Sequence, residues 1–335
     1  MTTVLQSLNR ALHAAMAESS RVLVVGEDIL DPYGGAFKVT KGLSSAYPDR
    51  VVGTPISEAG MTGLAIGLAL GGYRPVVEIM FGDFVTLCAD QLINHASKIA
   101  TMYGEPVPLP IVVRAPMGGR RGYGATHSQT LERLYLGLPG VSVVAASPVL
   151  DPGELLRRAV LEDDGPVLFV ENKVMYAERV LDAETLRDRY GCGMRLAEGP
   201  FPAVTLTPEA PDVTVVTYGG MTSLVLQAAK RLAEEEELAC EIVVEHRISP
   251  WDERAVFASV ERTRRCVVVE EGVAEWGWGA EIAARLTAFG LESPVQRVGA
   301  ARESIPVRKD LEERVLPQVD DIVAAVVRTV DEDPR

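Results

Sequence analysis

The stretch TPISEAGMTGLAIGLALGGYRPVVEIMFGDF (residues 54–84) joins a helix of small and apolar residues to a short strand. Glu58 stands at the start of the helix, and no charged residue follows it before Arg74. Glutamate is rarely fully buried unless it is paired, and burial favours its neutral form. A neutral carboxyl group can donate a hydrogen bond to a ring nitrogen, and Phe81 and Phe84 offer flat surfaces nearby. The stretch therefore indicates a site for a heteroaromatic cofactor.

Plainer interpretations compete with a cofactor site. The helix dipole also favours an acid in the first turn, and the two phenylalanines suit an ordinary core. Glycines at positions 60, 63, 67 and 71 recur along one helix face. Glycine costs a helix up to ~1 kcal/mol relative to alanine, so this stripe predicts close approach of another backbone. The uncharged run from Ala59 to Tyr73 is shorter than the ~20 apolar residues of a membrane span. We therefore expect a buried helix packed closely on another, at a subunit interface.

Composition limits the class of protein. The chain has 335 residues, enough for two domains, and its 47% apolar and 24% charged residues are typical of a soluble globular protein. A net charge of −14 argues against nucleic acid and anionic membranes as partners. The four cysteines are far apart and form no CxxC pair, which argues against a metal site or a disulfide framework. The first residues do not resemble a signal peptide, so we expect a cytoplasmic protein.

Short apolar strands alternate with helices along the chain. In the first half, strands are expected at 21–28, 51–56, 74–80, 110–116, 141–147 and 166–172, with a long helix over 83–103 and a shorter one over 130–138. This alternation predicts a doubly wound parallel α/β sheet, in which ligands bind beyond the carboxyl ends of the strands. We interpret the turn-rich residues 186–211 as a linker between an α/β domain at 1–185 and a smaller α/β domain at 212–335.

Four segments together resemble the beta subunit of thiamine-diphosphate-dependent 2-oxoacid dehydrogenases. They are GEDI (26–29), the stretch 54–84 quoted above, HSQT (127–130) and ENKVMY (171–176). This group includes the pyruvate, branched-chain 2-oxoacid and acetoin dehydrogenases and belongs to the transketolase superfamily. The resemblance implies a pyrimidine-binding domain followed by a transketolase C-terminal domain. It also implies an enzyme that decarboxylates a 2-oxoacid and acylates a lipoyl carrier, with thiamine diphosphate as cofactor.

The resemblance assigns roles to four side chains. Glu58 would hydrogen-bond the pyrimidine ring nitrogen of the cofactor and so promote loss of the proton from the thiazolium C2. Phe81 and Phe84 would pack against the pyrimidine. His127 would orient the substrate and assist acyl transfer to the lipoyl arm, because an imidazole that titrates near neutrality suits proton transfer. Without the resemblance, a loop histidine is usually solvated or locally hydrogen-bonded.

Two further features are less conventional. Arg120 and Arg121 stand in a loop where the family usually has glycine or small residues. A guanidinium at the mouth of the site suits a carboxylate or phosphate, so substrate binding and simple solvation are equal alternatives for this pair. The family often holds potassium with backbone carbonyls near the segment VLEDDGP (160–166), and the resemblance implies that Asp163 lies nearest to such an ion.

The chain lacks the elements that hold a diphosphate. A diphosphate needs a divalent metal and a cradle of backbone amides. The GDG element of the family is missing, since Gly82-Asp83 runs straight into Phe84, and no P-loop or GxGxxG loop is present. In the family the alpha subunit carries that element and the Mg2+. The resemblance thus implies an alpha partner in an alpha2-beta2 heterotetramer, with docking to a lipoyl acyltransferase core.

Two other functions stay open at this point. A split transketolase-like enzyme would transfer a ketol or acyl group without oxidation. The Arg120–Arg121 loop and the C-terminal departures, Glu270-Glu271 followed by Trp276 and Trp278, keep this alternative open. A non-catalytic scaffold would keep the fold alone, and the joint presence of Glu58 and His127 argues against it. The tryptophan pair suits either core packing or an interface anchor.

Overall fold

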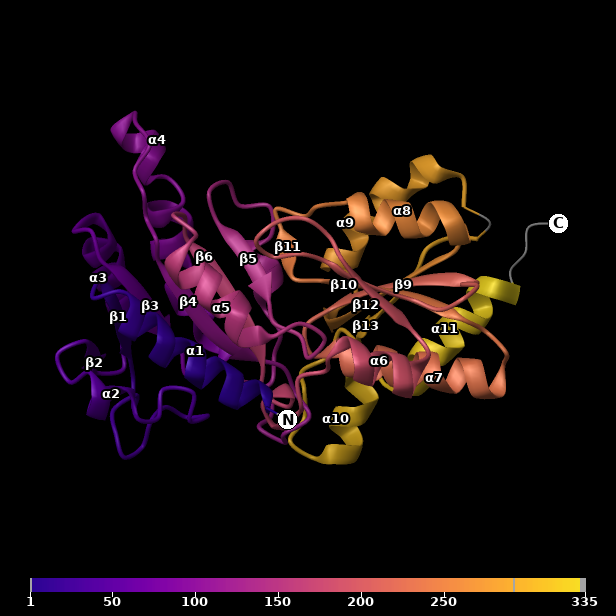
Figure 1. Ribbon diagram of the computed structural model, residues 1–335, viewed down its shortest axis with the longest axis horizontal. Helices are drawn as coiled ribbons and strands as arrows, with labels where there is room; N and C mark the ends of the chain where they lie inside the picture. The colour runs from indigo at the N-terminus through magenta and orange to yellow at the C-terminus, as the bar shows by residue number, and fades with distance from the viewer. Residues whose placement is uncertain (1, 292, 332–335) are drawn as a thin grey trace.

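The computed structural model describes residues 2–291 and 293–331, which form two α/β lobes lying side by side (Figure 1). The first lobe holds a seven-stranded sheet in the order β11-β5-β6-β4-β3-β1-β2. Its strands are β1 (Val22–Gly26), β2 (Val51–Gly53), β3 (Arg74–Glu78), β4 (Val112–Met117), β5 (Ser142–Ala145), β6 (Val167–Asn172) and β11 (Arg247–Ser249). All neighbours pair in parallel except β11 and β5. The predicted doubly wound α/β sheet is confirmed.

Helices cover both faces of this sheet. Val24 and Val25 are adjacent on β1, yet they belong to two different buried clusters, because successive strand side chains point to opposite faces. The cluster of Val24 includes α1 (Val4–Glu18) and α5 (Pro152–Leu161), and the cluster of Val25 includes α3 (Glu58–Leu70). The short helices of this lobe are α2 (Leu43–Ala46), η1 (Gly82–Cys88), η2 (Gln91–Ala96), α4 (Ile99–Tyr103), η3 (Glu132–Tyr135) and η4 (Met175–Ala177).

The long helix expected over 83–103 is wrong as a single element. The segment divides into the 3₁₀-helix η1, the π-helix η2 and the α-helix α4, which projects from the lobe in Figure 1. The Ser97 hydroxyl donates to the carbonyl of Ile93 at 2.6 Å, and bonds of this kind bend helices. The helix expected over 130–138 is likewise only the 3₁₀ turn η3.

The second lobe holds a six-stranded sheet in the order β13-β12-β9-β10-β8-β7. Its strands are β7 (Gly193–Leu196), β8 (Val204–Thr207), β9 (Val213–Tyr218), β10 (Cys240–Glu245), β12 (Cys266–Val273) and β13 (Gln296–Ala300). Its helices are α6 (Ala183–Tyr190), α7 (Met221–Glu235), α8 (Arg254–Thr263), α9 (Trp278–Leu286), η5 (Thr287–Phe289), α10 (Lys309–Val315) and α11 (Val319–Asp331). Residues 186–211 differ from the irregular linker expected there, because β7 and β8 pair antiparallel at the edge of this sheet. Their pairing depends on β10, which lies later in the chain and leaves no local signal.

The two lobes are joined by more than the chain between them. Strand β11 follows β10 of the second lobe, yet it pairs with β5 and completes the first sheet. Tyr218 and Trp278 of the second lobe lie in the same buried cluster as Met117 of the first. Trp278 is therefore core, whereas Trp276 is 90% exposed. The shared cluster fixes how the two lobes meet around the loops that follow β4 and β6.

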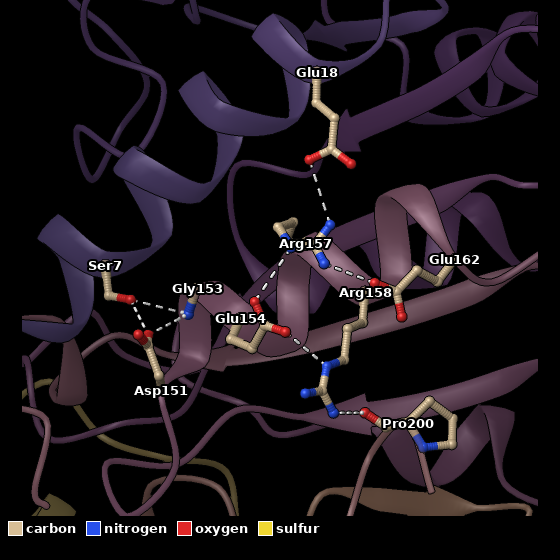
Figure 2. Close-up of polar contacts among 9 residues, drawn as sticks. All are labelled: Ser7, Glu18, Asp151, Gly153, Glu154, Arg157, Arg158, Glu162 and Pro200. Atoms are coloured by element: carbon tan, nitrogen blue, oxygen red, sulfur yellow. Dashed lines mark hydrogen bonds and ion pairs between the residues drawn. The ribbon is translucent and has the colours of Figure 1, made fainter.

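A polar network fastens α1 to α5 on the outer face of the first lobe (Figure 2). Asp151 caps α5 by accepting from the backbone N–H of Gly153 at 3.0 Å. Ser7 of α1 donates to Asp151 and also accepts from the Gly153 N–H at 3.0 Å. At the other end Arg157 forms an ion pair with Glu18 at 3.4 Å. The first turn of α5 therefore lies directly against the backbone of α1.

We expect Gly153→Ala to destabilise the chain, because a Cβ there would lie 2.5 Å from the carbonyl oxygen of Ser7. Overpacking of this kind costs ~1–3 kcal/mol, which scanning calorimetry would detect as a lower unfolding midpoint. Gly67→Ala is the matched control, since a Cβ at Gly67 meets nothing within 4 Å. Alanine is also the better helix former. An unchanged midpoint in Gly153→Ala would contradict the close packing of α1 on α5.

Candidate active site

Glu58 is the first residue of α3 and is only 4% exposed. Within residues 2–291 and 293–331, its carboxylate accepts no hydrogen bond. A second acid, Glu27, accepts from the backbone N–H of Ser57 at 3.0 Å. Burial raises the pKa of Glu27, and the nearby Glu58 carboxylate raises it further. The start of α3 therefore brings two buried acids close together, and burial disfavours the charged form of Glu27.

Three of the predicted site residues form one aromatic cluster. The ring centroid of His127 lies 4.6 Å from that of Phe81 and 5.3 Å from that of Phe84, and both contacts are edge-to-face. Phe37 and Tyr123 also contact Phe81 edge-to-face, with centroid distances of 5.4 and 5.7 Å. Phe81 and Phe84 are half-buried, so part of each ring is left for another molecule.

The backbone around this cluster is fixed by close packing and by one carboxylate. Position 82 requires glycine, because a Cβ there would collide with Met117. Asp83 accepts from the side-chain amide of Gln129 at 2.8 Å and from its backbone N–H at 3.3 Å. Since Gln129 belongs to HSQT, this contact ties the segment after β3 to the loop that carries His127.

Lys173 is the site residue that sequence reasoning missed. It is fully buried, and its Nζ donates to the carbonyl of His127 at 2.9 Å and to that of Pro116 at 3.4 Å. The Nζ also lies 5.6 Å from the centroid of the Phe81 ring. Burial lowers the pKa of Lys173 to about 8. The available signal was a lysine directly after an apolar strand, within ENKVMY.

A buried ion network holds the strand ends beneath the site. Arg114 donates to Glu171 at 2.7 and 2.8 Å and to Glu78 at 2.7 Å. Tyr176 donates to the same Glu171 at 2.6 Å. Burial raises the pKa of Glu78 even though Arg114 opposes it. Glu78 is the last residue of β3, Arg114 lies mid-strand on β4, and Glu171 is the penultimate residue of β6, so the network links three adjacent strands.

The two arginines of the glycine-rich loop diverge. The Arg120 guanidinium donates to the carbonyl of Pro317 at 2.6 Å, and its backbone N–H donates to Glu312 at 2.8 Å. Both partners belong to the second lobe. Arg121 is exposed and lies 6.0 Å from the centroid of the Tyr123 ring. Arg120 is thus hydrogen-bonded to the second lobe, whereas Arg121 is exposed. Substrate binding by either arginine stays a prediction.

The carbonyl of Asp163, expected near a potassium ion, accepts a hydrogen bond from the buried Arg74. Arg74 also donates through Nε to the carbonyl of Val160 at 2.5 Å and pairs with Asp164 at 3.1 Å. A cation on these oxygens would face a positive guanidinium, so this set of oxygens does not fit a monovalent ion. Across the described residues, no group of three or more His, Cys, Asp or Glu is placed to bind a metal.

Comparison with known proteins agrees with this fold. The family "Transketolase, pyrimidine binding domain" matches residues 1–178, and "Transketolase, C-terminal domain" matches residues 203–322. A solved chain called "Split gene transketolase, inactive beta4 tetramer" superposes with a TM-score of 0.71 at 22% identity, covering 98% of both chains. Fold and family together define a transketolase-type protein.

Sequence relatives narrow this class. The mitochondrial beta-1 subunit of the pyruvate dehydrogenase E1 component of Arabidopsis thaliana is 39% identical, covering 97% of this chain and 88% of its own. The acetoin:2,6-dichlorophenolindophenol oxidoreductase beta subunit of Cupriavidus necator is 35% identical, covering 97% and 96%. The pyruvate dehydrogenase E1 beta subunit of Rickettsia conorii is 35% identical, covering 97% of each. The chain belongs to the family of 2-oxoacid dehydrogenase beta subunits, as its motifs predicted.

None of the helices in the part of the chain that the structure describes has the length and apolarity to span a bilayer.

We expect the unfolding midpoint of the chain to be the same in potassium chloride and in sodium chloride of equal ionic strength. The reason is that Arg74 already engages the carbonyls of Val160 and Asp163. Scanning calorimetry is the measurement, with Arg74→Met as a reference. That variant leaves buried carbonyls unpaired and should lose ~1–3 kcal/mol. A rise of the wild-type midpoint in potassium alone would instead establish a monovalent-cation site.

Proposed function

We propose that this chain supplies the pyrimidine half of a thiamine-diphosphate site, in an enzyme that decarboxylates a 2-oxoacid and acylates a lipoyl carrier. One observation carries the proposal: the buried Glu58 carboxyl group has no hydrogen-bond partner among the described residues. The aromatic rings of Phe81, Phe84 and His127 add a surface for a flat heterocycle. The pyruvate and acetoin names of the relatives support this class of reaction.

The residues present fit an aminopyrimidine. When bound, thiamine diphosphate supplies a nucleophilic carbon and an electron sink for the loss of carbon dioxide. Glu58 holds a proton at its carboxyl oxygen and donates it in a hydrogen bond to the pyrimidine nitrogen. Its burial keeps water from competing for that proton. Phe81 and Phe84 cover the heterocycle and exclude water from it.

His127 is the proton carrier for acyl transfer in this proposal. Its Nδ1 lies 2.9 Å from the Thr126 hydroxyl oxygen, a contact that orients the ring. That leaves Nε2 to exchange a proton with the substrate or with the lipoyl sulfur. Lys173 holds the carbonyl of His127, and Phe81 supports the ring from its edge. The imidazole is thereby kept at the cofactor side of the loop.

An alpha subunit completes the site. The helix α3 buries one face on the first lobe but leaves the other exposed, namely Ala59, Gly60, Gly63, Leu64, Gly67 and Leu70. Ile56, just before the helix, is 79% exposed. The close helix contact expected from the glycine stripe is not met by the described residues, and an exposed apolar face of this kind suits a protein interface. We assign it to the alpha subunit of an alpha2-beta2 heterotetramer.

The proposal also covers the metal, the cellular location and the docking partner of the assembly. The alpha subunit supplies the Mg2+ and the diphosphate ligands that this sequence lacks. The assembly acts in the cytoplasm and docks to a lipoyl acyltransferase core.

Calorimetric titration with thiamine diphosphate and magnesium tests the shared site. We expect binding when this chain is assembled with its alpha subunit and none to the chain alone, because the diphosphate half is supplied by the partner. In the assembly, Glu58→Ala should lower kcat by at least ~100-fold while gel filtration shows intact tetramer. Tight binding to the chain alone would refute a shared site. Transfer of a ketol group to an aldose, without lipoyl acylation, would favour the transketolase-like alternative.

We expect Gly67→Ala to weaken association with the alpha subunit, because the added methyl group stands on the exposed face of α3. An overpacking cost of ~1–3 kcal/mol corresponds to a roughly 5- to 100-fold higher Kd. Analytical ultracentrifugation of the mixed subunits is the measurement. Gly193→Ala, on an exposed strand of the second lobe, is the matched control. Equal Kd values for wild type and Gly67→Ala would place the interface elsewhere.

A further inference from the structure

The loop that carries His127 is fastened to the second lobe at its start. The backbone N–H of Gly119 donates to Glu271 at 2.7 Å, and the next N–H, that of Arg120, donates to Glu312 at 2.8 Å. Both carboxylates come from the second lobe and both are buried, with Glu312 only 2% exposed. Two consecutive backbone N–H groups of the loop therefore donate to buried carboxylates, and hydrogen bonds to a charged acceptor are stronger than those to a neutral one.

The side chain of Arg120 adds a third fastening. Its Nη2 donates to the carbonyl of Pro317 at 2.6 Å and lies 3.8 Å from the sulfur of Met221. The backbone of Arg120 has a φ of 65°, a conformation that few non-glycine residues adopt. The contacts of this residue to the second lobe hold it there. Its Nη1 is buried and has no partner in the described chain, so a substrate carboxylate is the competing explanation for this guanidinium.

The loop is held again at its far end. The carbonyl of His127 accepts from Lys173, and the ring packs on Phe81 and Phe84. Between the two ends, Gly124 lies so close to Val307 of the second lobe that a Cβ would approach its methyl group to 2.7 Å. When one end of a loop is released, the residues between the two ends can adopt other conformations. The place of the imidazole therefore depends on the fastening at Arg120.

We infer that Arg120 is a positioning residue for His127: together with Glu312 it fastens the loop to the second lobe and so holds the imidazole over Phe81 and Phe84. This inference rests on the proposed role of His127 in acyl transfer. It makes the second lobe, which contributes no group to the aromatic cluster, responsible for the geometry of the proton carrier. Arg121, its exposed neighbour, has no such role.

Arg120→Gly in the assembled enzyme is the test, because glycine keeps the left-handed backbone and removes only the side chain. Misplacing a catalytic group by about 1 Å costs up to ~100-fold in rate. We expect the kcat for lipoyl acylation to fall ~10- to 100-fold with an unchanged KM for the 2-oxoacid. Arg121→Gly should keep the wild-type kcat for lipoyl acylation, and a raised KM in that variant would report only on substrate binding by Arg121. A raised KM with unchanged kcat in Arg120→Gly would show that the guanidinium binds substrate and would overturn the inference.

A double-mutant cycle separates positioning from general weakening of the fold. If Arg120 acts through His127, then Arg120→Gly should cause no further loss in a His127→Ala background. A loss of equal size in both backgrounds would overturn the inference. Full activity of His127→Ala alone would refute the role of His127 and this inference with it.

Hydrogen exchange tests the fastening without any activity. In the full chain, the amides of residues 118–128 should exchange faster in Arg120→Gly than in wild type or Arg121→Gly, because the loop opens more often. Unchanged exchange in Arg120→Gly would overturn the inference and leave the proposed function untouched.

Discussion

The buried guanidinium of Arg114 is the contact on which the site depends. It joins Glu78 and Glu171, so one side chain links three adjacent strands. Breaking a buried ion pair leaves an uncompensated charge, which costs ~3–5 kcal/mol. Each of these strands leads into a different part of the site. Phe81 follows β3, the His127 loop follows β4, and Lys173 follows β6. The network therefore fixes the relative places of residues that lie far apart in the sequence.

A second constraint comes from the other lobe. Strand β11 completes the first sheet, and the carboxylates of Glu271 and Glu312 hold the start of the His127 loop. The aromatic residues thus belong to the first lobe, while contacts with the second lobe restrict the conformation of the His127 loop. Neither lobe covers the exposed face of α3, which in the proposed assembly would lie against the alpha subunit.

Sequence reasoning reached the parts of this design that depend on local chemistry. The alternation of strands and helices gave the α/β class, and the ordered motifs gave the family. Sequence reasoning singled out the isolated acid of the helix, the two phenylalanines and the loop histidine, and the structure brings three of them, Phe81, Phe84 and His127, into direct contact. The sequence-based predictions were wrong where strands pair with segments far away in the sequence. The edge strands β7 and β8 looked irregular, because β8 finds its partner in β10 and β7 pairs with β8. The helix over 83–103 looked continuous, although hydroxyl and backbone contacts divide it.

The sequence by itself determined the fold class, the family and the identity of Glu58 and His127 as candidates, because hydrophobic periodicity and motif spacing are local properties. Only the tertiary structure decided what each neighbouring charge does. Arg120 and Arg121 are indistinguishable in sequence, yet one is held by Pro317 and the other is exposed. Lys173 became a site residue, and the carbonyl of Asp163 became a partner of Arg74. The physical reason is that the partner of a buried polar group is set by which strands and loops meet in space, and one stretch of sequence does not contain that information.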